Sequence, residues 1–331
     1  MDLLFLALYA ALGYLGGTAL LAQAGVSFLH AGQVRRAAAC FRLGAAVYPG
    51  RRNRVLMRSN LLAALCIMGD YEGVHQEWRE LEPRLAEAGP YAPLAVACYA
   101  ATLYYQGRYR EGLEVTGRPD ALLPEPRRGT FMAQDGDALR LLNRSSCLLA
   151  LGQLDEAERA VEQACRLQVS HPVVEQHLVL QRARVAFRRG HLEEAGRLAS
   201  TVETRRIPEI YLEEMELTRA YLLAFARLLP QAESCLDTPI KIPSPRGFLY
   251  RPMAEAAVAE MRGQPDEAVA HYRRALQSGH PAGEAGLRAG HLLARAGRLA
   301  EAQSLYEAAI RTDPESFWAT LAARHLQGRA S

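Results

Sequence analysis

Four arginines have the type and spacing in this sequence that most clearly suggest a function, and the function they suggest is binding. They are Arg184, Arg188, Arg288 and Arg295, and they are spaced to face one way. A guanidinium can hold a carboxylate through two parallel hydrogen bonds. Arginine and tyrosine are common anchors of binding surfaces, and asparagine or glutamine can both donate to and accept from a peptide backbone. These side chains predict a surface that recognises another molecule.

Catalytic signatures are missing from the sequence. It contains no glycine-rich phosphate loop, no Gly-x-Ser-x-Gly elbow and no His-Glu-x-x-His. The nine histidines are dispersed, and adjacent glutamates such as Glu193 and Glu194 point in different directions on a helix. We therefore predict no enzyme, no metal and no cofactor. An enzyme with an unfamiliar site in the loop 117–136 is the alternative, although no nucleophile–base pair is visible there.

Composition favours closely packed helices. The chain has 331 residues, half of them apolar and only 7% aromatic, and alanine and leucine are abundant. A formal net charge of +3 is too small to indicate a nucleic-acid partner. Six cysteines stand singly, without a Cys-x-x-Cys pair, which predicts small buried side chains in a reducing compartment.

The stretch 283–316 shows how the chain is organised. Small and apolar residues recur at helical spacing on both sides of Gly297, so each side can form an amphipathic helix. Glycine can end a helix in the left-handed conformation, which suits the tight connection. Ala302 lets the two helices approach closely, and Pro314 follows the second helix, where its missing N–H is tolerated. The stretch is predicted to be a helix–turn–helix unit.

This unit resembles the tetratricopeptide repeat, a helix–turn–helix of about 34 residues. The residues that match the repeat pattern are Gly290, Gly297, Leu299, Ala302, Tyr306, Ala309 and Pro314. The pattern can be followed through most of the chain, as eight helix pairs of which two match poorly. The resemblance implies an all-α fold, in which stacked pairs form a right-handed α–α superhelix, or solenoid, with a concave inner face.

The pattern also divides the chain into segments. They are a hydrophobic N-terminal helix over 1–22 that continues into the first repeat, an N-terminal array over 18–116, an inserted loop over 117–137, a middle array over 138–236, a proline-rich linker over 237–248, a C-terminal pair over 249–316 and a capping helix with a tail over 317–331. Clustered prolines and polar residues predict the loop and the linker. A capping helix is expected because the open end of a solenoid exposes its core.

In proteins with this repeat, the first helix of each pair lines the concave face. The resemblance therefore implies a groove that binds a protein or peptide partner. Its candidate binding residues are Asn60, Tyr104, Asn143, Gln181, Arg184, Arg188, Tyr221, Phe225, Arg288 and Arg295. The carboxylate clamp of chaperone-binding relatives is not matched, because Ala22 and Val26 stand where lysine and asparagine are required.

The N-terminal residues form a long apolar run. Residues 3–29 carry no charge, and about 20 such residues can cross a bilayer. Arginines follow directly, and the positive-inside rule places them and the repeats in the cytoplasm. We predict a single-pass anchor in the cell membrane through residues 3–22. The alternatives are a cap helix buried by another chain, and a cleaved signal peptide, for which Asp2 has the wrong charge.

The whole architecture is similar to that of bacterial membrane-anchored tetratricopeptide-repeat adaptors. That resemblance implies a membrane-tethered scaffold that holds a peptide or helix of a partner protein in its groove. The C-terminal cysteine module that binds metal in some of these adaptors is absent. The alternative is a soluble repeat subunit of a larger complex, whose apolar N-terminal helix packs on a partner protein.

Overall fold

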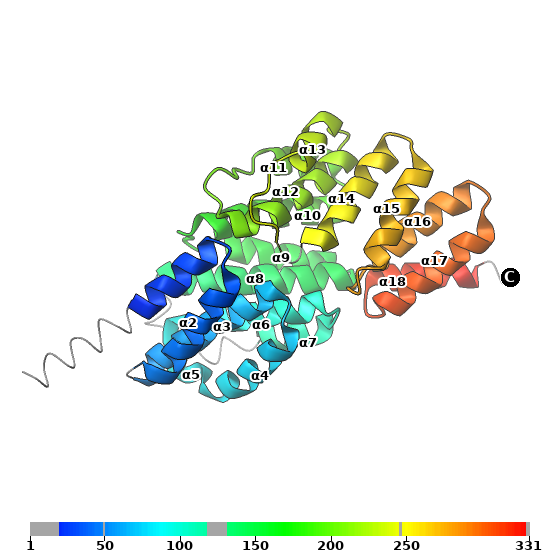
Figure 1. Cartoon of the computed structure of the whole chain (residues 1–331). Helices are drawn as coiled ribbons and strands as arrows, with labels where there is room; N and C mark the ends of the chain where they lie inside the picture. Colours follow the sequence, from blue (N-terminus) through cyan, green and yellow to red (C-terminus); the bar gives the residue numbers. More distant parts are fainter. Residues whose placement is uncertain (1–19, 49, 118–130, 245–246, 329–331) are drawn as a thin grey trace, which may run out of the picture.

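The chain folds into helices throughout the part that the computed structural model describes, which is residues 20–48, 50–117, 131–244 and 247–328 (Figure 1). Within these ranges there is no strand, so the predicted all-α class is confirmed. After a helix over 20–30, the first half contains α2 (Val34–Val47), α3 (Arg51–Met68), α4 (Tyr71–Leu81), the 3-10 turn η1 (Glu82–Arg84), α5 (Leu85–Ala88), the 3-10 turn η2 (Gly89–Tyr91), α6 (Ala92–Tyr105), α7 (Tyr109–Gly117), α8 (Phe131–Leu151) and α9 (Leu154–Cys165).

The second half continues the same alternation of longer and shorter helices. It contains α10 (Pro172–Arg188), α11 (Leu192–Ser200), α12 (Glu209–Phe225), α13 (Leu229–Leu236), α14 (Gly247–Met261), α15 (Pro265–Leu276), α16 (Gly283–Arg295), α17 (Leu299–Thr312) and α18 (Phe317–Gln327). Most helices pack first against the next helix in the chain and then against the following pair. The described residues thus form eight helix pairs and a final helix, as the repeat pattern predicts.

The turn inside each of the eight pairs depends on one residue with a positive φ angle. Glycine fills this position in seven pairs, because a residue without Cβ adopts the left-handed conformation at little cost. These glycines are Gly32, Gly69, Gly107, Gly152, Gly190, Gly263 and Gly297. In the sixth pair the position holds Arg227, the one non-glycine residue with positive φ (62°) in the described ranges. Arg227 is therefore a strained residue in an otherwise regular series of turns.

Close approach of the two helices in a pair depends on small residues. A Cβ built on Gly290 would lie 2.4 Å from Cε1 of Tyr306, and one on Gly25 would lie 2.4 Å from Cε1 of Phe41. Both aromatic rings are almost completely buried. A ring from the second helix therefore packs directly on the backbone of the first. This contact recurs in the first and last pairs, which explains why the repeat pattern has a small residue at the position of Gly290.

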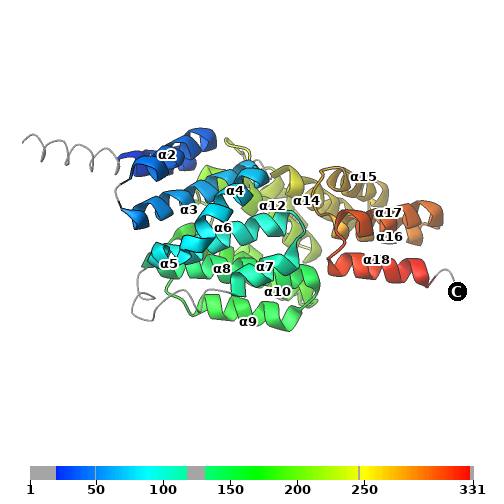
Figure 2. The ribbon, with the colours of Figure 1, turned by 90° about the horizontal axis from the view of Figure 1, so that it is seen from below.

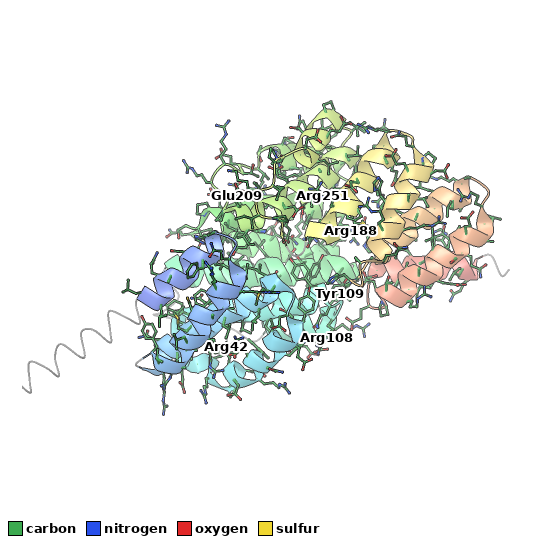
Figure 3. All side chains as sticks on the ribbon, viewed as in Figure 1. Arg42, Arg108, Tyr109, Arg188, Glu209 and Arg251 are labelled. Atoms are coloured by element: carbon green, nitrogen blue, oxygen red, sulfur yellow. The ribbon has the colours of Figure 1, made fainter. Side chains whose placement is uncertain are left out.

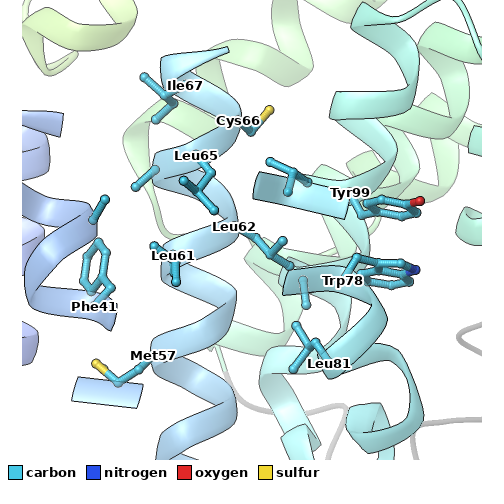
Figure 4. Packing of buried hydrophobic residues seen from close by; sticks show 14 of the residues in the cluster. Phe41, Met57, Leu61, Leu62, Leu65, Cys66, Ile67, Trp78, Leu81 and Tyr99 are labelled. Atoms are coloured by element: carbon cyan, nitrogen blue, oxygen red, sulfur yellow. The ribbon is translucent and has the colours of Figure 1, made fainter. Parts of the chain in front are cut away.

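The N-terminal core shows how neighbouring pairs share a hydrophobic layer (Figure 4). Phe41 of α2 faces Met57 and Leu61 of α3, and all three are buried. On the opposite side of α3, the rings of Trp78 and Tyr99 stack with centroids 4.3 Å apart. Each such layer is closed only by the next pair, so the helices stabilise one another in sequence order.

The stack curves so strongly that its last helix returns to its middle (Figures 1 and 2). Helix α18 packs on α8, where Phe317 lies so close to Gly152 that an added Cβ would be 2.7 Å from its ring. Earlier in the chain, Ile242 of the connection between α13 and α14 packs against the N-terminal core and approaches Gly32. The inner face of the solenoid is therefore partly enclosed by the protein itself.

Two predicted segments differ in detail: the loop over 117–137, and the linker over 237–248, whose last two residues belong to α14. Helix α8 begins at Phe131, so residues 131–137, predicted as loop, are helical. The reason is that the first turns of α8 support the next repeat: Asp135 accepts hydrogen bonds from the backbone of Ser170 and His171. Residues 118–130 lie outside the described residues, as do residues 3–19 of the predicted anchor. Across the described ranges, no helix combines the length and apolar character needed to cross a membrane.

Candidate functional site: the interior of the solenoid

A central cavity of about 210 Å³ lies on the inner face, where the N-terminal, middle and C-terminal helices meet. Tyr104 of α6, Arg184 and Arg188 of α10 and Tyr221 of α12 line one side. The other side is formed by the start of α16 and by α18, with residues 280–285 and Trp318. Figure 3 shows Arg188 and Tyr109 near the centre of the view, between the two ends of the stack. The candidate site is this cavity.

Arg184 is held in the cavity wall by neutral partners. Its Nη2 donates to the hydroxyl of Tyr104 at 2.9 Å, and its Nη1 donates to Oε1 of Gln181 at 3.0 Å. Gln181 is buried and its amide in turn donates to Ser145. No carboxylate of the described residues forms an ion pair with Arg184. Its positive charge is thus fixed in position without being neutralised.

Arg188, one helical turn after Arg184, has fewer polar partners than Arg184. Its guanidinium carbon lies 4.1 Å from the ring centroid of Trp318, in a cation–π arrangement. Among the described residues it has no hydrogen-bond or ion-pair partner. Burial lowers the pKa of Arg188 from its ordinary value, with the carboxylate of Glu284 opposing the change. Arginine nevertheless stays charged at neutral pH, so Arg188 presents an unpaired cation at the cavity.

Arg288 differs because its charge is paired. Its Nε donates to Oε1 of Glu284 at 3.0 Å, and its guanidinium lies 4.1 Å from the ring centroid of Phe225. The hydroxyl of Tyr221 donates a short hydrogen bond to the same Glu284 oxygen. Arg288 therefore joins the middle repeats to the C-terminal repeats. It also lines an outer pocket of about 450 Å³, which shares Phe187, Arg188 and Trp318 with the central cavity.

The floor of the cavity contains a buried carboxylate. Asp313 is 4% exposed and accepts hydrogen bonds from the hydroxyl of Tyr109 at 2.9 Å and from the backbone N–H of Gly283 at 3.3 Å. Burial raises its pKa to about 6, although these hydrogen bonds favour the ionised form. His280 also lines the cavity, and burial lowers its pKa. At neutral pH Asp313 is therefore mainly ionised and His280 is neutral.

The structure brings together four of the ten predicted binding residues in the central cavity: Tyr104, Arg184, Arg188 and Tyr221. Phe225 and Arg288 line the adjoining outer pocket. The remaining four lie elsewhere. Asn60 is half-buried on α3, Asn143 donates to the backbone oxygen of Ala97 at 2.8 Å, Gln181 is buried behind Arg184, and Arg295 is exposed at the end of α16. The four arginines therefore do not all face one way.

Three residues that matter for the cavity were not singled out from the sequence: Tyr109, Asp313 and Trp318. Tyr109 and Asp313 lie at helix ends, and Trp318 lies on the predicted capping helix. Their role depends on how far the stack curves, because curvature alone brings α18 to α10. The pair formed by Glu284 and Arg288 does leave a sequence signal, since residues four apart meet on one helical face.

Comparison with protein families agrees with the helix pairs described above. Residues 260–324 match a profile of the tetratricopeptide repeat, and residues 140–168 match a second profile of the same repeat. The chain is a tetratricopeptide-repeat protein. Residues 140–168 include most of α8 and all of α9, on one side of the cavity. Residues 260–324 include α15 to α17 and most of α18, on the other side. A search of curated proteins finds no match to the chain.

Proposed function

We propose that this tetratricopeptide-repeat protein is an interaction scaffold that takes an extended segment of a partner protein into the interior of its solenoid. The observation that supports this is the cavity, where Tyr104, Tyr221, Arg184 and Arg188 converge from the first helices of three pairs. Aromatic and arginine side chains gathered in a partly enclosed pocket are typical of interface anchors. The cavity holds one or two side chains, because it is smaller than the roughly 300 Å³ of a typical small-molecule site.

The test is capture of partner proteins by the full chain and by a variant with a filled cavity. Ala150 lines the cavity and is half-buried on α8, so Ala150→Phe would occupy the space. Ala270 is exposed on α15, and Ala270→Phe adds the same ring outside the site. We expect the wild type and Ala270→Phe to retain the same proteins and Ala150→Phe to lose them. Equal retention by all three folded proteins would refute binding in the interior.

A second proposal concerns the place where the scaffold works, which we infer to be a membrane. Residues 3–29 are uncharged, and no acidic residue occurs between residues 3 and 69 although that stretch contains seven arginines. Arg35, Arg36 and Arg42 of α2 are exposed, and so is Leu43 with 51% of its surface accessible. Arginine is favoured on the cytoplasmic side of a membrane anchor. The proposal is an anchor through residues 3–22 with the repeats in the cytoplasm.

The matching experiment is extraction of membranes that contain the full chain. A chain anchored through the bilayer stays with the membrane after alkaline carbonate treatment and enters solution only with detergent. A soluble subunit whose apolar helix packs on a partner protein would be released with that partner. Release of the whole population by carbonate would therefore contradict the anchor and favour the soluble alternative.

A further inference from the structure

We infer that the central cavity is a binding site for a single carboxylate group, held by Arg188 with Arg184 as the second cation. The inference rests on the proposed function, because it names the chemistry by which the interior would recognise its partner. It starts from two cations in the cavity wall that lack a direct ion pair within the described ranges. Two guanidiniums, one helical turn apart on α10, lie side by side. Neither has an ion-pair partner among the described residues.

Such an arrangement is less favourable than a paired one. Arg184 and Arg188 are both half-buried, and a charge withdrawn from water is best tolerated when it is paired and hydrogen-bonded. Within the described ranges, the hydrogen-bond partners of Arg184 are all neutral: Tyr104, Gln181 and Ser146. Among the described residues Arg188 has no hydrogen-bond partner and lies on the faces of Trp318 and Phe317. The carboxylate of Glu284 favours its charge, and the nearby charge of Arg184 disfavours it. An anion between them would remove the repulsion and satisfy the free guanidinium hydrogens of Arg188.

The carboxylates already present do not fill this role. Glu284 is paired with Arg288 and accepts from Tyr221. Asp313 is held by Tyr109 and by the backbone of Gly283, and within the described ranges it forms no ion pair. Arg288 pairs with both Glu284 and, at 3.8 Å, Glu260, so among the described residues Arg184 and Arg188 are the cations of the cavity wall without an ion pair. A carboxylate with one negative charge suits this place better than a dianionic phosphate, which would add more negative charge near Asp313 and Glu284.

Access to the site is possible from the outer pocket. Phe187, Arg188 and Trp318 line both the outer pocket and the central cavity. The stacked pair of Arg188 and Trp318 therefore separates the two spaces. A carboxylate that arrives through the outer pocket meets Arg188 first, and it can bind the guanidinium edge while the face stays on Trp318. The carboxylate can come from an acidic side chain of a partner segment or from a small free carboxylate.

The test uses three probes with the full chain: a capped pentapeptide with one central glutamate, its glutamine counterpart, and glutarate. Calorimetric titration measures binding to the wild type, to Arg188→Gln and to the exposed control Arg295→Gln. We expect the glutamate peptide to bind about tenfold or more tightly than the glutamine peptide. Arg188→Gln should abolish that preference, and Arg295→Gln should keep it. Glutarate binding without peptide binding would assign the site to a small carboxylate instead of a partner segment.

A stability measurement distinguishes loss of the binding cation from misfolding of the variant. If Arg188 is a binding cation, Arg188→Gln should leave the midpoint of thermal unfolding unchanged or raised, because it removes a half-buried charge that has no ion pair among the described residues. If Arg188 only supports α18 through Trp318, the midpoint should fall. A wild type that binds no carboxylate probe, or equal binding by Arg188→Gln, overturns the inference. In that case loss of partner capture by Ala150→Phe would still support the proposed function.

Discussion

The hydroxyl of Tyr109 donates a 2.9 Å hydrogen bond to Oδ1 of Asp313 across 204 positions of sequence. Tyr109 begins α7 and Asp313 directly follows α17, so the bond joins the N-terminal array to the last repeat. Close by, the backbone N–H of Arg110 donates to the Glu315 carboxylate at 3.1 Å. These contacts hold the curved stack closed around its cavity. They also place a titratable group at the point of closure.

The stability of the closed form should depend on pH through Asp313. Its pKa rises from 3.8 in the unfolded chain to about 6 in the fold, so the folded protein binds this proton more tightly. The resulting stabilisation is complete below pH 3.8 and is lost as pH rises through about 6. Replacement of the carboxyl group by an amide removes the titration. The stability of Asp313→Asn relative to wild type should therefore increase by about 2 kcal/mol between pH 4 and pH 7.

Urea unfolding at several pH values measures this difference. Asp237→Asn removes a negative charge at an exposed position and serves as the control. An Asp313→Asn curve that runs parallel to wild type over the whole range would show that the Asp313 carboxyl is not the titrating group.

The Tyr109 hydroxyl should contribute to stability at neutral pH. In Tyr109→Phe, the carboxylate of Asp313 keeps its burial but loses a donor, and hydrogen bonds to charged groups contribute about 1.5–3 kcal/mol. We expect a loss of that size at pH 8 by chemical denaturation. Tyr48→Phe is the matched control, because Tyr48 is half-buried at the end of α2 and remote from the closure. Equal effects of the two substitutions would mean that the Tyr109–Asp313 bond has no net stabilising effect.

The strained turn at Arg227 should be relieved by glycine. Arg227 has φ of 62°, whereas its counterpart Gly297 has φ of 77° in open space. Because a left-handed conformation costs a side-chain-bearing residue about 1–2 kcal/mol, Arg227→Gly should raise the free energy of unfolding by up to about 1 kcal/mol after the entropy of glycine is included. Gly297→Ala should lower it by about 1 kcal/mol. Thermal unfolding shows whether each variant is more or less stable than the wild type. A loss of stability in Arg227→Gly would contradict this account.

The close approach at Gly290 should not tolerate a methyl group. The added Cβ would lie 2.4 Å from Cε1 of Tyr306, a ring that is only 1% exposed. Overpacking of this kind costs about 1–3 kcal/mol, which exceeds the gain of about 1 kcal/mol from replacing glycine by alanine in a helix. Gly290→Ala should therefore destabilise the last repeat.

A double-mutant cycle with Tyr306→Leu checks the cause. The smaller side chain leaves room for the added methyl group, so the double variant should lose less stability than the sum of the single variants. Simple additivity would locate the effect of Gly290→Ala elsewhere.

The sequence by itself determined the helix pairs of this protein. Helical spacing of small and apolar residues, with glycine at the turns, is a local property, because each pair buries its apolar face mainly against its neighbours in sequence. The spacing alone was therefore enough to place Gly290, Gly297, Ala302 and Tyr306 correctly. The resemblance to the repeat family selected Tyr104, Arg184, Arg188 and Tyr221, because first helices line the concave face in that family, and these four residues line the cavity.

Only the tertiary structure decided which of these residues share a cavity and what completes it. The curvature of the stack is the sum of small rotations between successive pairs, and no single stretch of sequence encodes that sum. It brings Trp318 against Arg188 and Asp313 against Tyr109, and it leaves Arg295 exposed on the surface. It also turns Asn143 and Gln181 inward as hydrogen-bond partners of the protein itself. Local patterns therefore specified the repeats, and long-range packing specified the site.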